Sequence, residues 1–191
     1  MIKLIFRIYI RLIGWKIKGS LPEGIKKCVI IAAPHTSIRD FIIGRAAFYS
    51  MGINKISFLI KKEMFTFPLG VLIKTLGGIP IDRSNSGNMV NVIGKMFKEK
   101  ESLLLIITPE GTRKYVENWK KGFYLIAQQA EVPIVLSYVD YEKKEGGIGT
   151  ILHPTGNYEE DLKVIQEFYK DKTAKYPEMF SLSSIYSIDQ K

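Results

Sequence analysis

Short apolar runs without polar alternation recur along this chain, and stretches of helical length and spacing separate them. The runs span residues 29–33, 56–60, 78–81, 103–108 and 134–139, and the helical stretches span residues 40–51, 67–76, 89–100 and 122–130. Strands that lack alternation are typical of sheets that helices cover on both faces. The pattern predicts an α/β fold: a single layered domain with a mostly parallel or mixed central sheet flanked by helices.

Length and composition agree with one folded domain. The chain has 191 residues, of which 46% are hydrophobic and 25% are charged, so we expect a sizeable core rather than disorder. Its one cysteine, Cys28, excludes an internal disulfide and lies in a predicted strand, where we interpret it as a small core residue. We also expect an edge strand over residues 146–153 and a helix over residues 161–169.

The net charge of +9 is concentrated near the N-terminus. Residues 1–30 contain seven cations and one acid, Glu23, and therefore account for +6 of the total. A local basic excess of this kind indicates a polyanionic partner, which is either nucleic acid or an anionic lipid surface.

The N-terminal segment has the pattern of an amphipathic helix. Lys3, Arg7 and Arg11 recur every four residues, and apolar side chains fill most of the remaining circumference. No uncharged run in residues 1–18 exceeds four residues, whereas a membrane span needs roughly 20. We predict that residues 1–20 form a helix on a membrane surface and that residues 21–191 form the globular domain. The alternative is a helix that packs on the domain and shows its basic edge to water, and both can hold together.

The segment A-P-H-T-S-I-R-D-F places His35 where a predicted strand gives way to a helix. Along a regular helix His35 and Asp40 would point roughly 140° apart, so they can meet only if His35 precedes the helix. Thr36 or Ser37 can cap the first turn. In that geometry Asp40 accepts a hydrogen bond from one ring nitrogen, and the other nitrogen can take a proton from a substrate hydroxyl. The alternative is an ordinary loop histidine near a capping aspartate.

The segment T-P-E-G-T-R follows another buried run and is typical of a phosphate-binding turn. Gly111 lets the backbone approach a ligand, Thr112 supplies a hydroxyl and an N–H, and Arg113 offers a planar fork to phosphate oxygens. Glu110 would repel phosphate, so we expect it to orient Arg113 or to accept a hydrogen bond from a substrate hydroxyl. The alternative is a plain turn with an ion pair.

Three further cations are candidates for an anion site. Arg83 follows the short run G-G-I-P-I-D and can be the second cation of a phosphate clamp, or a surface residue paired with Asp82. Lys120 and Lys121 precede a predicted helix at Gly122, so they can give secondary anion contacts near its N-terminus.

Taken together, the blocks P-H-T-S-I-R-D, G-G-I-P-I-D-R, P-E-G-T-R and V-P-I-V resemble, in order and spacing, the glycerolipid acyltransferases over residues 30–140. This resemblance is to the bacterial lysophosphatidic acid acyltransferases and their relatives. It implies a glycerol-3-phosphate acyltransferase-like fold, with residues 21–191 as the acyltransferase domain. It also implies that His35 is the general base and Asp40 its partner. The residues implied to bind the acceptor phosphate are Arg83, Glu110, Gly111, Thr112 and Arg113.

The activity that the resemblance implies is transfer of a fatty acyl group from acyl-CoA or acyl-carrier protein to a lysophospholipid hydroxyl, which converts 1-acylglycerol-3-phosphate to phosphatidic acid. We expect no cofactor, no metal and no nucleic acid, and a peripheral location on the cytoplasmic face of an anionic membrane. The sequence departs from the family pattern at Pro34, where asparagine is usual, at Lys114 and at Leu136. These departures leave another acceptor, such as a lyso-aminolipid, as an alternative.

Two other classes of function are consistent with parts of the sequence. A non-enzymatic protein that binds nucleic acid or anionic membrane would explain the charge, and its binding would depend steeply on salt. A metallohydrolase could use His35 and Asp40 as ligands, but the second histidine, His153, lies in a distant glycine-rich segment, so a full ligand set is hard to assemble.

Overall fold

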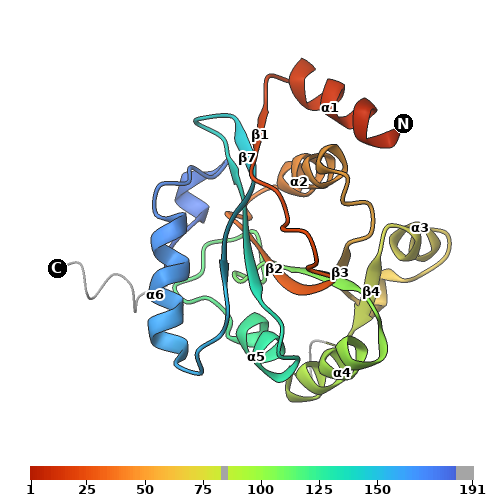
Figure 1. Ribbon diagram of the computed structural model, residues 1–191, viewed down its shortest axis with the longest axis vertical. Coiled ribbons are helices and arrows are strands. Elements are labelled where there is room, and N and C mark those ends of the chain that lie inside the picture. The colour runs from red at the N-terminus through yellow and green to blue at the C-terminus, as the bar shows by residue number, and fades with distance from the viewer. Residues whose placement is uncertain (83–85, 184–191) are drawn as a thin grey trace.

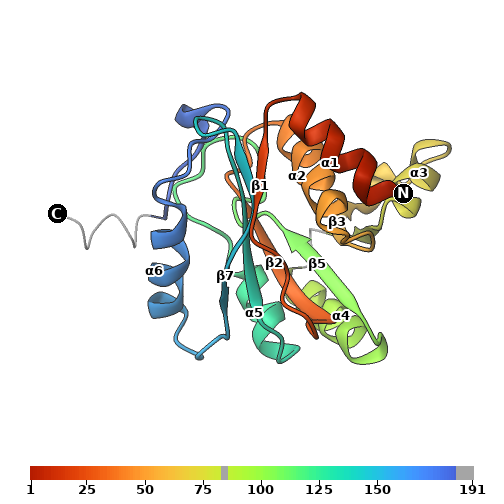
Figure 2. The same cartoon turned by 45° about the horizontal axis from the view of Figure 1, so that its top comes forward.

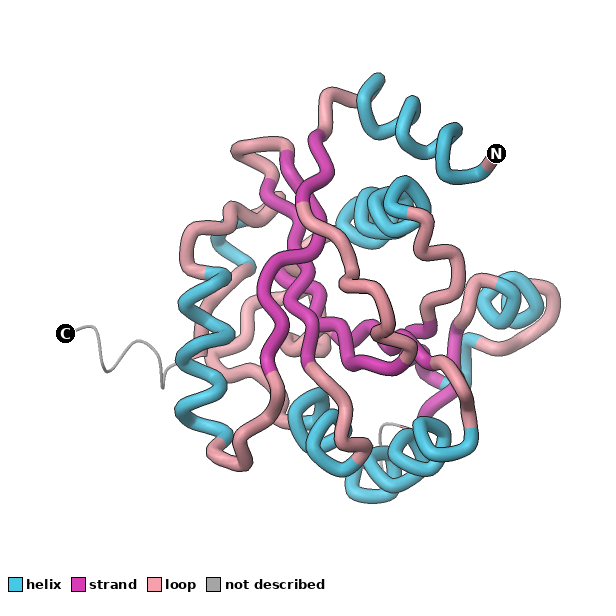
Figure 3. The backbone as a smooth tube through the Cα atoms, in the orientation of Figure 1, coloured by secondary structure: helices cyan, strands magenta, loops and turns pink. Residues whose placement is uncertain are grey.

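The computed structural model describes residues 1–82 and 86–183 and contains one mixed seven-stranded sheet with helices on both faces (Figures 1 and 3). The strands are β1 (Lys16–Lys18), β2 (Lys27–Ala33), β3 (Ser57–Lys61), β4 (Gly78–Ile81), β5 (Leu103–Ile107), β6 (Ile134–Asp140) and β7 (Glu145–Leu152). The α-helices are α1 (Ile2–Leu12), α2 (Ile38–Met51), α3 (Leu69–Thr75), α4 (Ser86–Glu99), α5 (Gly122–Gln129) and α6 (Tyr158–Tyr169), with 3-10 turns η1 (Lys62–Met64) and η2 (Pro177–Met179). The sheet order is β1-β7-β6-β2-β5-β3-β4, and only the β6–β7 pair is antiparallel. The predicted α/β layered domain is confirmed.

The central strand β2 is buried on both faces. Cys28, Val29, Ile30 and Ile31 have no exposed surface. Val29 and Ile31 belong to the core cluster built with α4, α5 and α6, whereas Cys28 and Ile30 belong to the cluster that includes Phe48 of α2. Because successive side chains of a strand point to opposite faces, an uninterrupted apolar run is what a sheet between two helical layers requires. Figure 2 shows α1 and α2 on one side of the sheet and α5 on the other.

The N-terminal helix ends at Leu12 instead of continuing toward residue 20, and it packs on α2. Ile10 is buried, and Arg7 Nε donates a hydrogen bond to Ser50 O at 3.1 Å. The opposite side of the helix keeps Leu4 and Leu12 in solvent. The helix therefore packs on the domain as the alternative expects, but its basic edge contacts α2 through Arg7 and Lys3, and an apolar face stays exposed.

The sheet extends one strand beyond β7, so the expectation that β7 lies at the edge is wrong. The additional strand, β1, is three residues long and has a lysine at each end, so it lacks the apolar run that identifies the others. Glycines permit the close approach of the two strands. A Cβ on Gly19 would lie 1.9 Å from Ile148 O, and one on Gly147 would lie 1.9 Å from Lys18 O.

Candidate active site

The loop between β2 and α2 brings His35 to the carboxyl edge of the sheet. Ser37 is the N-cap of α2, and its Oγ accepts a hydrogen bond from Arg39 N at 3.2 Å. Asp40 completes a capping box, because its carboxylate accepts a hydrogen bond from Ser37 N. His35 therefore precedes the helix, as the spacing predicts, and its ring lies next to the first helical turn.

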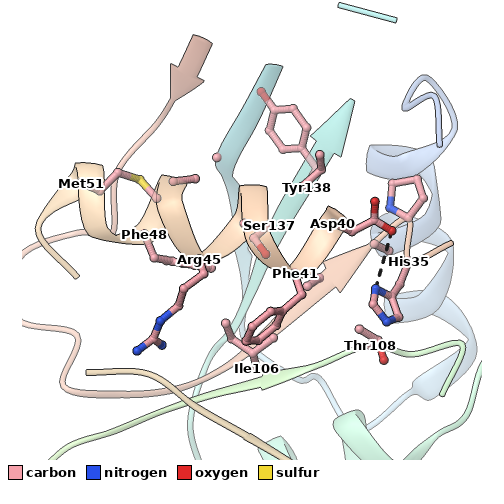
Figure 4. Close-up of a pocket in the computed structure, with 17 residues that line it drawn as sticks. His35, Asp40, Phe41, Arg45, Phe48, Met51, Ile106, Thr108, Ser137 and Tyr138 are labelled. Atoms are coloured by element: carbon pink, nitrogen blue, oxygen red, sulfur yellow. Dashed lines mark ion pairs between the residues drawn. The ribbon is translucent and has the colours of Figure 1, made fainter. Parts of the chain in front are cut away.

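Asp40 lies beside the His35 ring without a hydrogen bond to it. His35 Nδ1 and Asp40 Oδ2 are 3.7 Å apart (Figure 4), which exceeds a hydrogen-bond distance. Oδ2 instead accepts hydrogen bonds from Thr36 N and Ser37 N, both at 2.7 Å. The structure thus replaces the expected hydrogen bond with a close electrostatic contact, because the two backbone donors already occupy that oxygen.

The surroundings of His35 favour its neutral form. Burial lowers the pKa of His35 below its ordinary value; the negative charge of Asp40 opposes this shift, and the positive charge of Arg113 reinforces it. A neutral imidazole is the form that can accept a proton. Because Nδ1 faces Asp40, Nε2 is the nitrogen that a substrate hydroxyl can use.

Glu110 joins the turn after β5 to the loop that carries His35. Its side chain is buried, and Oε1 accepts a hydrogen bond from His35 N at 3.0 Å. Oε2 is buried without a hydrogen-bond partner. Burial raises the pKa of Glu110 to about 8, against the opposing effect of backbone donors that include His35 N. Glu110 Oε1 is therefore bound to the base loop, and the expected contact of Glu110 with a substrate hydroxyl stays a prediction.

The rest of this turn is held by local backbone contacts. Gly111 has a φ of +67°, a conformation that favours glycine, and its N–H donates to Thr108 O at 3.0 Å. Thr112 Oγ1 accepts a hydrogen bond from Lys114 N at 3.3 Å. Arg113 is exposed and lies near enough to His35 to lower the pKa of the imidazole. The structure thus brings Arg113 and His35 together from the ends of neighbouring strands.

The two described lysines among the remaining candidate cations lie at different places. A Cβ on Gly111 would lie 3.0 Å from Lys120 Cδ, so the Lys120 side chain lies over the turn. Lys121 Nζ instead lies 4.6 Å from the centre of the Tyr158 ring, at the start of α6. Lys120 therefore joins the candidate anion site and Lys121 belongs to a separate contact. Arg83 lies outside the described residues.

An apolar pocket of about 80 Å³ adjoins His35. It lies between α2, which contributes Phe41 and Phe48, and the sheet, which contributes Ile106 and Tyr138 (Figure 4). Arg45 is the cation among its lining residues. Its Nη2 donates to the Tyr49 hydroxyl at 2.7 Å, while Nε and Nη1 are buried without a hydrogen-bond partner. The pocket therefore suits a chain that is mostly apolar but offers an oxygen acceptor.

Two contacts at the site come from residues that sequence reasoning missed. The Tyr141 hydroxyl donates a hydrogen bond to Asp40 Oδ1 at 2.7 Å, and Tyr176 N donates to Thr36 Oγ1 at 3.3 Å. Both tyrosines lie more than a hundred residues from their partners, and no local pattern marks them. A possible signal for Tyr141 is its place directly after the apolar run of β6, whose carboxyl end meets that of β2.

The described residues contain neither a candidate metal site nor a candidate membrane-spanning helix. In residues 1–82 and 86–183, no three histidine, cysteine or acidic side chains converge in a way that could hold a metal ion. His153 follows β7, whose end pairs with the start of β6, so it lies at the sheet edge opposite to His35. Among the helices of these two ranges, none has the length and apolar character to cross a bilayer.

Two comparisons with known proteins found a similarity. A family model described as Acyltransferase matches residues 16–139. The fold is similar to the crystal structure of the 1-acyl-sn-glycerophosphate (LPA) acyltransferase PlsC from Thermotoga maritima, with a TM-score of 0.60 and 19% sequence identity over 91% of this chain and 80% of that chain. No curated protein matches in sequence. At this identity the likeness to the solved structure concerns the fold.

Proposed function

We propose, since this chain belongs to the acyltransferase family, that it moves a fatty acyl group from acyl-CoA or acyl-carrier protein to a lysophospholipid hydroxyl. The proposed acceptor is 1-acylglycerol-3-phosphate and the product is phosphatidic acid. One observation carries the proposal: His35 has a lowered pKa, lies 3.7 Å from Asp40 and within the electrostatic reach of Arg113, and adjoins an apolar pocket. That arrangement suits a lipid hydroxyl next to a phosphate.

In the proposed mechanism, His35 Nε2 takes the proton from the acceptor hydroxyl as its oxygen attacks the thioester carbonyl. The carboxylate of Asp40 stabilises the imidazolium that forms. The tetrahedral intermediate then collapses, the carbon–sulfur bond breaks, and the imidazolium returns its proton to the departing thiolate. Positioning and general-base catalysis each contribute orders of magnitude to such a reaction. These steps assign no role to a metal or a cofactor.

The proposed acceptor site is the 110–113 turn. Arg113 and the Thr112 hydroxyl would bind the phosphate, with Lys120 alongside and the Gly111 backbone in close approach. We also propose, from the sequence, that Arg83 is a second cation that binds this phosphate. Because the turn follows a strand next to that of His35, a bound phosphate would hold the adjacent hydroxyl near the imidazole.

The proposed place of the acyl chain is the pocket beneath α2. Its apolar lining suits methylene groups, and the two open donors of Arg45 suit a carbonyl oxygen of the lipid. We propose that the protein is peripheral and lies on the cytoplasmic face of an anionic membrane, which it contacts through the basic N-terminal helix. The acyl donor and the acceptor would then both be reached at the bilayer surface.

A product assay tests the function. Purified protein is offered an acyl thioester and a panel of lysolipids that includes lysophosphatidate, lysophosphatidylcholine and a lyso-aminolipid, and products are identified by mass spectrometry. We expect phosphatidic acid from lysophosphatidate and none from His35→Ala of unchanged fold. Turnover by His35→Ala at the wild-type rate would overturn the mechanism, and preference for the aminolipid would overturn the acceptor.

A further inference from the structure

The segment between β3 and β4 keeps its large apolar side chains in solvent. Phe67 is 89% exposed, Val71 60% and Leu72 55%, and Met64 and Leu69 are nearly half exposed. Single exposed apolar residues are normal on a soluble protein, but five of them within nine residues form a patch that marks an interaction site.

Packing on the inner side fixes this segment, which comprises η1 and α3. Gly70 lies so close to the preceding turn that a Cβ there would come within 2.5 Å of the Phe65 carbonyl. Ile73 is buried against β4, where a Cβ on Gly78 would lie 2.4 Å from it. The inward residues thus hold the backbone, and the outward side chains of Val71 and Leu72 have no role in that packing.

The start of this segment, η1, lies at the same edge of the sheet as the candidate active site, and α3 then runs back along the β3–β4 pair to the start of β4. β3 is parallel to β5, with Phe58 opposite Ile106, so the chain that leaves β3 emerges beside the 110–113 turn. The first turns of α2, at this same edge, expose Ile38 and Ile42. Figure 1 shows α3 as a projection at the end of the β3–β4 pair. Exposed apolar side chains therefore occur on α2 and in the chain that follows β3, two segments that begin at the edge of the sheet that holds His35.

Lysines outnumber acids in this segment. Lys61, Lys62 and Lys74 accompany a single acid, Glu63, within residues 61–75. Lys62 forms an ion pair with Asp82 at 2.5 Å. The neighbouring helices α1 and α2 contain one acidic residue between them, Asp40, and it is buried. Apolar tips bordered by lysines match an anionic bilayer, which offers acyl chains below a layer of phosphates. A second copy of this chain would instead bring lysines against lysines.

We propose that the η1–α3 segment is a second lipid-contacting element, distinct from the N-terminal helix, which inserts Phe67 and Leu72 into the acyl region of an anionic bilayer. Lys61 and Lys74 stay at the level of the phosphates, and the His35 pocket faces the lipid. The proposal rests on the proposed function for its lipid substrate, while its test needs no turnover.

Flotation of the full chain with phosphatidylcholine vesicles, with and without phosphatidylglycerol, tests this contact. We expect Phe67→Ser/Leu72→Ser to lower the partition coefficient on the anionic vesicles about tenfold or more, because two apolar side chains lose their buried site. The control is Leu125→Ser/Val164→Ser, which removes two apolar side chains that are each about half exposed on α5 and α6, and it should stay within about twofold of the wild type. Flotation of the Phe67/Leu72 variant equal to that of the wild type would overturn the proposal.

A second measurement reports insertion directly. Cys28 is buried, so a cysteine introduced at an exposed position can be labelled selectively. An environment-sensitive fluorophore on Phe67→Cys should shift to the blue when anionic vesicles are added, and one on Val164→Cys should not. If Phe67→Cys responds to acyl-carrier protein or to unlabelled chain but not to vesicles, the lipid assignment is wrong. Turnover of a short, monodisperse acceptor should be the same in the Phe67/Leu72 variant and the wild type, which separates this proposal from the proposed function.

Discussion

The Tyr141 hydroxyl lies 2.7 Å from Asp40 Oδ1, the carboxylate oxygen opposite the one that the His35 ring approaches at 3.7 Å. Tyr141 and the N–H groups of Thr36 and Ser37 therefore fix the Asp40 carboxylate from both sides. An acid held in this way keeps its charge in place beside the imidazole before any substrate binds, which is the condition for electrostatic stabilisation without reorganisation.

Removing the Tyr141 hydroxyl should slow the reaction without abolishing it. In Tyr141→Phe the Asp40 carboxylate loses one of its three hydrogen bonds, so we expect kcat to fall roughly tenfold, a fraction of the contribution of a positioned base. KM for the acceptor should change little. Unfolding should become easier by about 1 kcal/mol, as for one lost hydrogen bond. Steady-state kinetics and denaturant titration check this, with the exposed Tyr115→Phe as the control.

The dependence of activity on pH should follow the lowered pKa of His35. The imidazole must be neutral to act as a base, so activity should be lost only as pH falls through a value below the ordinary 6.5. The profile of kcat/KM against pH measures this limb. An acidic limb centred well above 6.5 would contradict the assignment of His35 in its present surroundings.

Arg113→Met should change both the acceptor affinity and the pH profile. Its positive charge lowers the pKa of His35, so its loss should move the acidic limb to higher pH. Loss of a charge-assisted phosphate contact should also raise KM for lysophosphatidate by about tenfold or more. A neutral or zwitterionic lysolipid offers the control, because its KM should respond less. An unchanged KM for every acceptor would remove Arg113 from the proposed phosphate site.

Glu110→Gln should flatten the dependence of stability on pH. The pKa of Glu110 is about 8 in the folded protein, against 4.5 as its ordinary value, so the folded state binds more protons than the unfolded chain between these pH values. Stability contributed by this group is therefore lost as pH rises through that window, by at most about 1.4 kcal/mol per pH unit. Glutamine cannot titrate, and its carbonyl can still accept from His35 N. Urea midpoints of both proteins at the two ends of the window measure the difference.

Most of the fold could be predicted because apolar periodicity decides it. The strands β2 to β6 and the helices between them lie within a few residues of their predicted positions. The short β1 could not be predicted, since its pairing depends on the backbone approach that Gly19 and Gly147 allow and not on an apolar face.

The sequence identifies which residues gather at the candidate site better than it identifies the contacts between them. The blocks around His35 and Arg113 show that two turns meet at one sheet edge, and the structure confirms that meeting. Spacing alone could not show that Asp40 faces the backbone of its own cap, or that Glu110 reaches the base loop. Asp40 accepts hydrogen bonds from backbone groups only three and four residues away, whereas the contact of Glu110 joins segments 75 residues apart. The partnership of Asp40 with Tyr141 is equally non-local.

The hydrogen bond from His35 N to Glu110 Oε1 has a practical consequence for chimeras of this enzyme. We expect a graft that exchanges residues 111–118 for those of a relative to alter the proposed phosphate site and to leave His35, the proposed base, in place. A graft that begins one residue earlier and removes the Glu110 carboxylate should also loosen the loop that carries His35. Attempts to redirect this scaffold to a new lipid should therefore keep position 110 and place the junction after it.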